Sequence, residues 1–417
     1  LKCNTLKRDT LKMEHSKVER SKYNHLLAKW TQNIQPSAMQ NSLQRTSDDL
    51  ISFALGLPDT SLFPFHKYKE SIIKTLNSSH DILQYTPPLR ALKKHIVTLM
   101  KMRQVTCNES QIFITNGAQQ GLNLLSRLLL NSGDKIVVED FTYPGFLQAV
   151  TPLSPKLLIV PTNHKTGIDL DILESTLKTH KSIKFLYTIC DGHNPLGISL
   201  DNKSRKRLAD LASTYKTFII EDDPYGFLYY DKITRPIRSF NPEYACYVGT
   251  FSKILAPSFR LGWIVLPEEL VPKLAILKES TDINMATFTQ HVTLNILERG
   301  VLIDNLSSIR EEYKKRRNVM LKTVSDFFPS GTEVITPTHG FFMWLKLPIG
   351  YDTSKLFDHA LDKAKVAFIP GHAFTPRPNE ISKHCMRLNF SYNSPSIIQE
   401  GIERLGNMLE KTSLKVI

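Results

Sequence analysis

The sequence predicts an α/β fold with a large domain, built on a seven-stranded and mostly parallel sheet, and a smaller discontinuous α+β domain. Between about residues 110 and 267, short β-branched runs alternate with segments of helical period, which is typical of a parallel sheet covered by helices. After about residue 300, one charged helix precedes shorter strand-like pieces. A chain of 417 residues is also too long for one small core, so two domains are expected.

Seven runs are predicted to form the strands of the large sheet. They are 111–115, 135–139, 156–160, 184–189, 217–221, 245–249 and 263–266. Between them, Leu122, Leu125 and Leu129 recur at helical spacing, and so do the apolar residues of 204–215, which predicts helices that lie on the sheet.

The C-terminal part is predicted to begin with a helix over 308–327, whose run of charges indicates a solvated face. Strands are expected at 340–347, 366–369 and 386–390. The expected organisation is an N-terminal extension and arm over 1–48 that partly joins the small domain, a large domain over 49–300 and a small domain over 301–417. Residues 1–12 are interpreted as an extension that precedes a candidate start at Met13.

The composition excludes several classes of protein. The net charge of +13 comes from scattered basic residues mixed with acidic ones, without a zinc-finger or single-strand-binding pattern, so no nucleic-acid partner is expected. No run of about 18 apolar residues predicts a membrane span. The cysteines are far apart and lack a CxxC pair, which indicates reduced thiols, a cytoplasmic location and no metal site; they are Cys3, Cys107, Cys190, Cys246 and Cys385.

Lys253 lies in the segment GTFSKILAPSFRLGW (249–263), directly after a predicted strand. A lysine forms an imine only after it loses its proton, and its free pKa of about 10.4 means that this requires burial or neighbouring positive charge. Ser252 and Arg260 add a hydroxyl and a planar guanidinium suited to a phosphate. The pattern is typical of a site for a phosphorylated aldehyde such as pyridoxal phosphate, although the pair alone also suits a solvated surface.

Polar or aromatic residues follow the other predicted strands, at the edge of the sheet where α/β proteins bind ligands. Gly117 opens a helix whose free N–H groups can hold an anion. Tyr143 can stack on a flat ring, and Asn194 can donate to a phenolate oxygen. Taken singly, each also fits a structural role in a helix start, a packed loop or a turn. His193 is interpreted as a structural histidine.

Two adjacent acids, Asp222 and Asp223, end the run 217–221. Only one is expected to point inward, because successive strand residues alternate sides. An inward carboxylate beneath a pyridine nitrogen would keep that nitrogen protonated, and Tyr225 can reach the phenolic oxygen of the same ring. Capping of the next turn is the structural alternative for the acid.

Together, these motifs make the chain resemble the class I/II aminotransferases of the fold-type I pyridoxal-phosphate enzymes, over about residues 53–392. The resemblance is strongest to the branch that contains 2-aminoadipate, kynurenine and aromatic aminotransferases. It rests on the segments LGLPDTSLFP, LQYTPPLRAL, EDDPYGFLYY and GTFSKILAPSFRLGW.

The resemblance implies a role for each matching residue. Lys253 would carry the cofactor as an aldimine and move the α-proton, and Asp222 would pair with the pyridine nitrogen. Arg387 would bind the substrate carboxylate, and Asn194 would also contact substrate. Gly56 would lie in the segment that closes over substrate. The remaining implied contacts are Asn194 and Tyr225 to the phenolic oxygen, Tyr143 to the ring, Gly117, Ala118, Gln119, Thr250, Ser252 and Arg260 to the phosphate, and Tyr85 to the phosphate of a neighbouring subunit.

Some positions depart from the family pattern. Ala118 stands where a serine or threonine is usual, so one phosphate hydrogen bond is lost, worth about 1.5–3 kcal/mol if charge-assisted. Thr250 replaces a usual serine, His193 a usual glutamine and Leu196 a usual threonine, and Pro87-Pro88 lies where a glycine is common.

The expected function is transfer of the amino group of an L-amino acid to a 2-oxo acid, through pyridoxamine phosphate, by a homodimer with shared active sites. A lyase, decarboxylase or synthase on the same fold is the first alternative, because the same motifs serve those reactions. A cofactor-binding regulator is the second, although the residues before the fold are too few for a winged-helix domain. Aromatic, 2-aminoadipate-like and branched donors all remain open.

Overall fold

The computed structural model describes residues 22–33, 49–377 and 379–413. The chain divides into two compact units, Leu1–Gln35 and Pro36–Ile417. In the first unit, the described residues form two short 3-10 helices, η1 (Asn24–Leu26) and η2 (Lys29–Asn33). The predicted extension over 1–12 and the candidate start at Met13 lie outside the described residues. All elements below belong to the second unit.

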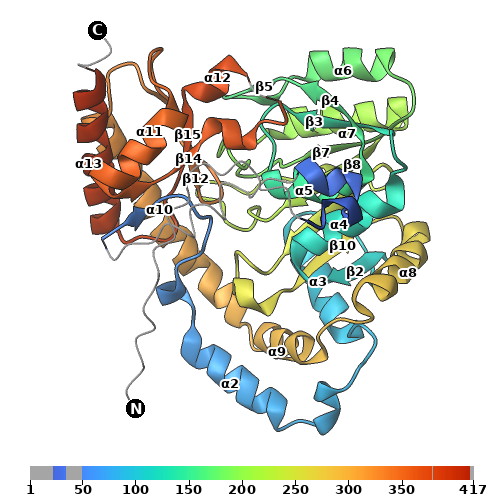
Figure 1. Ribbon diagram of the computed structural model, residues 1–417. Coiled ribbons are helices and arrows are strands. Elements are labelled where there is room, and N and C mark those ends of the chain that lie inside the picture. Colours follow the sequence, from blue (N-terminus) through green and yellow to red (C-terminus); the bar gives the residue numbers. More distant parts are fainter. Residues whose placement is uncertain (1–21, 34–48, 378, 414–417) are drawn as a thin grey trace. The chain divides into compact units, whose positions relative to one another are not determined.

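Among the described residues, seven strands form one sheet in the order β2-β10-β9-β8-β7-β3-β4 (Figure 1). The strand β10 pairs antiparallel with β2 and β9, and the other neighbours in this sheet are parallel. The predicted fold class is therefore confirmed, with strand ends within two residues of those expected. The strands are β2 (Ile112–Thr115), β3 (Lys135–Glu139), β4 (Lys156–Val160), β7 (Ile183–Thr188), β8 (Phe218–Asp223), β9 (Ala245–Thr250) and β10 (Gly262–Val265).

Helices cover both faces of this sheet because its strands are apolar on both sides. Ile136 and Val138 pack with α4 (Gly117–Leu129), α5 (Pro144–Val150) and α8 (Val271–Asp282). Val137, which points to the opposite face, packs with α6 (Leu170–Thr179) and α7 (Asn202–Tyr215). The helices predicted from the leucine stripe and from 204–215 are thus α4 and α7.

Four further helices, counted among the described residues, lie beside the edge strand β2 or farther from the large sheet (Figure 1). They are α2 (Phe65–Leu76), α3 (Arg90–Met102), α9 (Thr287–Glu298) and α10 (Val301–Phe327). Both α2 and α3 pack on α9, and α3 also packs on β2. Within the described part of the chain, no helix has the length and apolarity needed to cross a membrane.

A second sheet holds four short strands in the order β11-β12-β15-β14, counted among the described residues, and all its pairs are antiparallel. The predicted strand over 366–369 is in fact two strands, because β13 pairs with the N-terminal β1 whereas β14 pairs with β15. The elements of this part are β1 (Ile51–Ser52), β11 (Glu333–Val334), β12 (Phe342–Lys346), α11 (Thr353–His359), β13 (Val366–Ala367), β14 (Ile369–Pro370), α12 (Glu380–Lys383), β15 (Cys385–Asn389) and α13 (Pro395–Ser413); a small hairpin joins β5 (Thr162–Asn163) to β6 (Gly167–Ile168).

The charge run of α10 is not a fully solvated face, so that prediction is wrong for part of the helix. Arg316 and Arg317 are buried. Arg316 Nη2 donates to Asp59 Oδ2 at 2.7 Å and its Nη1 donates to Ser391 O at 2.6 Å, while Arg317 Nη1 donates to Pro337 O at 2.8 Å. These arginines connect the helix to three distant loops, a role that a charge count along one helix does not reveal.

Candidate active site

The ends of the central strands open onto a cavity of about 260 Å³. It lies where the sequence expects a ligand site, at the carboxyl ends of parallel strands. The predicted site residues that line it are Gly56, Ala118, Gln119, Tyr143, Asn194, Asp222, Tyr225, Thr250, Ser252, Lys253, Arg260 and Arg387. Residues from seven separate stretches of the chain therefore meet in one place.

Lys253 follows β9 and extends into this cavity. Its Nζ donates a hydrogen bond to Gly56 O at 2.7 Å. Burial lowers the pKa of Lys253 to about 8, and the positive charges of Arg387 and Arg260 act in the same direction. A substantial fraction of this amine is therefore neutral near physiological pH, as a nucleophilic lysine requires.

Two hydroxyls and a glycine at a helix start surround Arg260, which lines the cavity. Its Nη1 lies 3.5 Å from Ser252 Oγ, and Thr250 Oγ1 donates to the same Oγ at 3.0 Å. Gly117 begins α4 with φ of +76°, and a Cβ there would lie 2.7 Å from Arg260 Nη2. Only glycine therefore lets the guanidinium lie against the helix start, where free N–H groups favour an anion.

Asp222, in β8, also lines the cavity. Burial raises its pKa to about 7, a hydrogen bond from Tyr187 opposes that shift, and the charge of Asp223 adds to it. Its Oδ2 accepts from Tyr187 Oη at 2.8 Å, whereas its buried Oδ1 has no hydrogen-bond partner within the described residues. Asp223 instead accepts from Arg103 at 2.9 Å and does not line the cavity, which is the alternation expected of a strand.

Arg387 also lines the cavity and lies close to two aromatic rings. Its guanidinium carbon lies 4.0 Å from the ring centroid of Phe342 and 4.7 Å from that of Phe374. Its Nη1 donates to Asn194 Oδ1 at 2.6 Å and its Nη2 to Ala54 O at 2.6 Å. Burial lowers its pKa to about 10, so it stays charged at neutral pH.

Two tyrosines face the space between these groups. Tyr143 Oη donates to Gln119 Oε1 at 3.3 Å, and Gln119 Nε2 donates to Gly145 O at 2.7 Å, so the glutamine fixes the ring. Tyr225 is buried against Phe341 and Phe342, with ring centroids 5.5 and 5.8 Å away. Burial raises the pKa of Tyr143 to about 12 and that of Tyr225 further, so both hydroxyls keep their protons.

Three of the sequence expectations fall outside the cavity wall. Gly117 lies directly behind Arg260, as described above. His193 is buried and its Nε2 lies 3.4 Å from Glu139 Oε1, which agrees with a structural histidine. Tyr85 is 73% exposed and does not line the cavity of its own chain.

Sequence reasoning missed four residues that shape the site: Tyr187, Phe342, Phe374 and Arg103. Tyr187 was predicted only as part of a strand, although a tyrosine in an otherwise apolar run signals a hydroxyl with a partner. Phe342 belongs to the strand expected over 340–347, for which the sequence predicts no contact with the site. The contacts of Phe374 and Arg103 join segments too distant in the chain for any local pattern to reveal.

The chain has clear relatives among known proteins. Residues 48–405 match the family model of aminotransferase class I and II. Aromatic-amino-acid aminotransferase 1 of Thermococcus litoralis is 38% identical over 380 residues, with 88% of this chain and 90% of the relative covered. The 2-aminoadipate transaminase of Thermus thermophilus is 30% identical, with 93% and 97% covered. A crystal structure of kynurenine aminotransferase from Pyrococcus horikoshii, in complex with PMP, matches with a TM-score of 0.88 at 35% identity, covering 94% of this chain and 98% of that one.

Proposed function

Since the chain belongs to the class I and II aminotransferase family and is a pyridoxal-phosphate-dependent aminotransferase, we propose that Lys253 attaches the cofactor and that Arg387 binds the α-carboxylate of the amino donor. The observation that carries this proposal is the shared cavity. A buried amine with a pKa of about 8, a carboxylate with an unpartnered oxygen and a ring-stacked guanidinium all line it.

The residues present fit pyridoxal phosphate. The unpartnered Oδ1 of Asp222 is suited to the pyridine nitrogen, since a buried carboxylate oxygen without a donor is costly. The glycine start of α4 and Arg260 suit the phosphate. Asn194 and Tyr225 offer an amide and a hydroxyl to the phenolic oxygen.

When bound, pyridoxal phosphate supplies the electron sink that weakens the Cα–H bond of an amino acid attached to it. The chain supplies orientation and proton transfer. Arg387 fixes the donor carboxylate by a planar, bidentate contact, which sets the direction of that bond. Lys253 Nζ can then accept and return a proton, because its lowered pKa lies close to neutral pH.

The wall near Arg387 favours a donor with an uncharged side chain. Gly56, Phe342, Ile369, Ala373 and Phe374 line this part of the cavity. Within the described residues, the lysines and arginines that line the cavity are Lys253, Arg260 and Arg387, and each already has a role. A second carboxylate on the donor would therefore lack a cation from this part of the chain. We propose aromatic or branched donors, which the name of the Thermococcus relative supports.

We also propose a homodimer with shared active sites, in the cytoplasm. Tyr85 is exposed, and so is Leu83, an apolar residue two positions earlier in the chain. The loop of Tyr85 is held by a hydrogen bond from Asn284 Nδ2 to Thr86 O at 2.5 Å. The tyrosine is thus presented at the surface, where a second copy can take it up. Unpaired thiols at Cys107, Cys190, Cys246 and Cys385 suit a reducing compartment.

A subunit-mixing experiment tests the shared site. Lys253→Ala and Tyr85→Ala subunits are expected to have reduced activity when each is expressed alone. The two are co-expressed with different tags, and the hybrid is purified on both tags. One site of the hybrid then combines an intact Lys253 with an intact Tyr85. Activity of the hybrid well above the mean of the two parents supports sharing, and activity equal to that mean contradicts it.

The reaction itself is tested by a panel of donors. Phenylalanine, tyrosine, kynurenine and leucine are expected to give kcat/KM about tenfold or more above aspartate, since a buried unpaired carboxylate costs more than 1.4 kcal/mol. Turnover must depend on a 2-oxo acid acceptor. The comparisons do not favour the lyase, decarboxylase, synthase or regulator alternatives, and release of ammonia or CO2 without an acceptor would revive the first three.

A further inference from the structure

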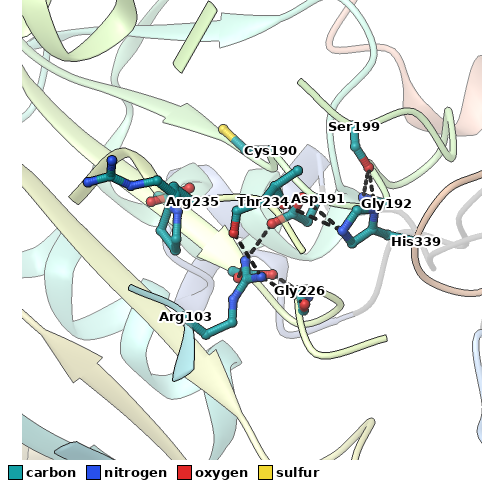
Figure 2. A network of polar contacts seen from close by, with 12 residues as sticks. Arg103, Cys190, Asp191, Gly192, Ser199, Gly226, Thr234, Arg235 and His339 are labelled. Carbon is teal, nitrogen blue, oxygen red and sulfur yellow. Dashed lines mark hydrogen bonds and ion pairs between the residues drawn. The ribbon is translucent and has the colours of Figure 1, made fainter. Parts of the chain in front are cut away.

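Arg103 is a completely buried arginine that does not line the cavity. It directly follows α3, which packs on the edge strand β2, yet its guanidinium reaches the end of β8 and the loops that follow β7 and β8. Its Nη2 donates to Asp191 Oδ2 at 2.6 Å and to Asp223 Oδ2 at 2.9 Å. Its Nη1 donates to Gly226 O at 2.9 Å and to Thr234 O at 3.1 Å. Figure 2 shows Asp191, Thr234 and Gly226 around the Arg103 guanidinium.

Three of the four acceptors are near neighbours, in sequence, of the residues that face the cofactor ring. Asp223 directly follows Asp222, and Gly226 directly follows Tyr225. Asp191 lies three residues before Asn194. One cation therefore contacts both the end of β8 with the loop that follows it, which carry the carboxylate and the hydroxyl of the ring site, and the loop after β7, which carries the amide.

The local backbone is shaped around this contact. Gly226 N donates to Asp223 Oδ1 at 2.6 Å, which closes the loop after β8 on itself. A Cβ on Gly226 would lie 2.2 Å from Asp223 Oδ2 and 2.3 Å from Arg103 Nη2. A glycine is therefore needed for the guanidinium to reach the carboxylate.

The two carboxylates that accept from Arg103 differ in their other cationic partners. Asp191 has a second cation, because Arg205 Nη2 donates to its Oδ1 at 2.5 Å, and His339 Nε2 lies 3.4 Å from the same oxygen. For Asp223, Arg103 is the one cation partner within the described part of the chain. Loss of the Arg103 fork would leave a buried carboxylate unpaired, directly beside Asp222 in the chain.

On the basis of the proposed function, we propose that Arg103 is a positioning residue for the cofactor ring. It fixes, from behind, the end of β8 that carries Asp222 and the loops that carry Asn194 and Tyr225. A structural ion pair alone would stabilise the fold without a specific effect on the ring site. The two roles differ in what a variant loses, since the positioning role links Arg103 to cofactor affinity.

The test uses Arg103→Lys, which keeps the charge and removes the planar fork, and Gly226→Ala, which leaves both charges and obstructs their contact. Apoenzyme is titrated with pyridoxamine phosphate, because this form needs no bond to Lys253 and so reports on the ring and phosphate contacts. The dissociation constant is expected to rise about tenfold in each variant. Hydrogen exchange of the amides in 191–194 and 222–226 is expected to become faster in both apo variants.

The matched control is Arg238→Lys. Arg238 is also fully buried, but it donates to Pro242 O at 2.9 Å and Ala245 O at 2.5 Å, at the other end of β9 from the cavity. This variant is expected to lose thermal stability while its pyridoxamine phosphate affinity stays within about twofold of wild type. A folded Arg103→Lys protein with wild-type affinity and unchanged amide exchange overturns the inference.

If both test variants fail to fold, Asp223→Asn, which preserves the size of the side chain, gives the same two readouts with the same expected direction. The outcome also separates this inference from the proposed function. Should Lys253→Ala still hold pyridoxal phosphate covalently, the proposed function fails. Should that function stand while the Arg103 and Asp223 variants bind normally, only the positioning role fails.

Discussion

Tyr187 donates a hydrogen bond to Asp222 across 2.8 Å, between the neighbouring strands β7 and β8. The tyrosine ring is held in place by parallel stacking on Phe146, with ring centroids 3.7 Å apart. The hydrogen bond occupies Oδ2 of Asp222 and leaves Oδ1 without a partner among the described residues. Burial raises the pKa of Asp222 to about 7, and the Tyr187 hydroxyl opposes that rise by stabilising the charged form. Tyr187 therefore helps to decide how much of Asp222 is ionised at neutral pH.

Replacing Tyr187 by Phe should raise the pKa of Asp222 above about 7, since a hydrogen bond to the carboxylate is lost. Less of the carboxylate is then ionised at pH 7, and kcat/KM should fall about tenfold there. Activity should recover in part as the pH rises, because Asp222 ionises when the pH passes its raised pKa. The measurement is a pH profile of kcat/KM for both proteins.

Tyr351→Phe is the control for this profile, because Tyr351 is also buried and its hydroxyl donates to Leu409 O at 3.5 Å, away from the cavity. Its profile should coincide with that of wild type. If kcat/KM falls at the same acidic pH in Tyr187→Phe and in wild type, the hydrogen bond does not set the ionisation of Asp222.

Arg387→Lys should lower kcat/KM for the amino donor about a hundredfold, mainly through KM, because a lysine offers neither a bidentate fork nor a planar group to pack on Phe342 and Phe374. Affinity for pyridoxal phosphate should change by less than about threefold, since Arg387 is proposed to contact the donor and not the cofactor. Steady-state kinetics and a cofactor titration measure the two effects. Equal losses of both would mean that Arg387 supports the whole site and does not select the carboxylate.

Arg316→Met should lower the free energy of unfolding of the apoenzyme by about 3 kcal/mol, because it leaves Asp59 and Glu312 without their buried partner. Arg404→Met is the matched control, since Arg404 pairs with Glu400 at the surface of α13, where an ion pair contributes about 0.5 kcal/mol. Urea unfolding at pH 7 measures both. A similar small loss in the two variants would refute a structural role for the buried pair.

The large sheet could be predicted from the sequence because its signals are local. Each strand is a short apolar run bounded by turn residues, and Lys135–Glu139 and Lys156–Val160 have the predicted bounds. The strand pairs of the C-terminal part are harder to predict. For example, the pairing of Val366–Ala367 with Ile51–Ser52 joins residues more than 300 positions apart. No local pattern specifies such a partner.

The candidate site was predictable where a residue type carries chemistry by itself. Lys253, Asp222 and Arg387 stand in recognisable motifs, and the structure brings all three to one cavity. What the sequence could not reveal is how the protein tunes them. The pKa of Asp222 depends on Tyr187, and the end of β8 that carries Asp222 is bound by Arg103 through Asp223. Both contacts come from elements whose own sequence indicates only core packing.

The assignment of Lys253 as the residue that attaches the cofactor is tested most directly by reduction with borohydride. Holoenzyme is reduced so that a cofactor–lysine linkage becomes permanent, then digested, and its peptides are identified by mass spectrometry. The phosphopyridoxyl group should be found on Lys253 and on no other lysine, and Lys253→Ala should carry none. A group on a different lysine of the wild-type protein, or a modified Lys253→Ala protein, would contradict the assignment.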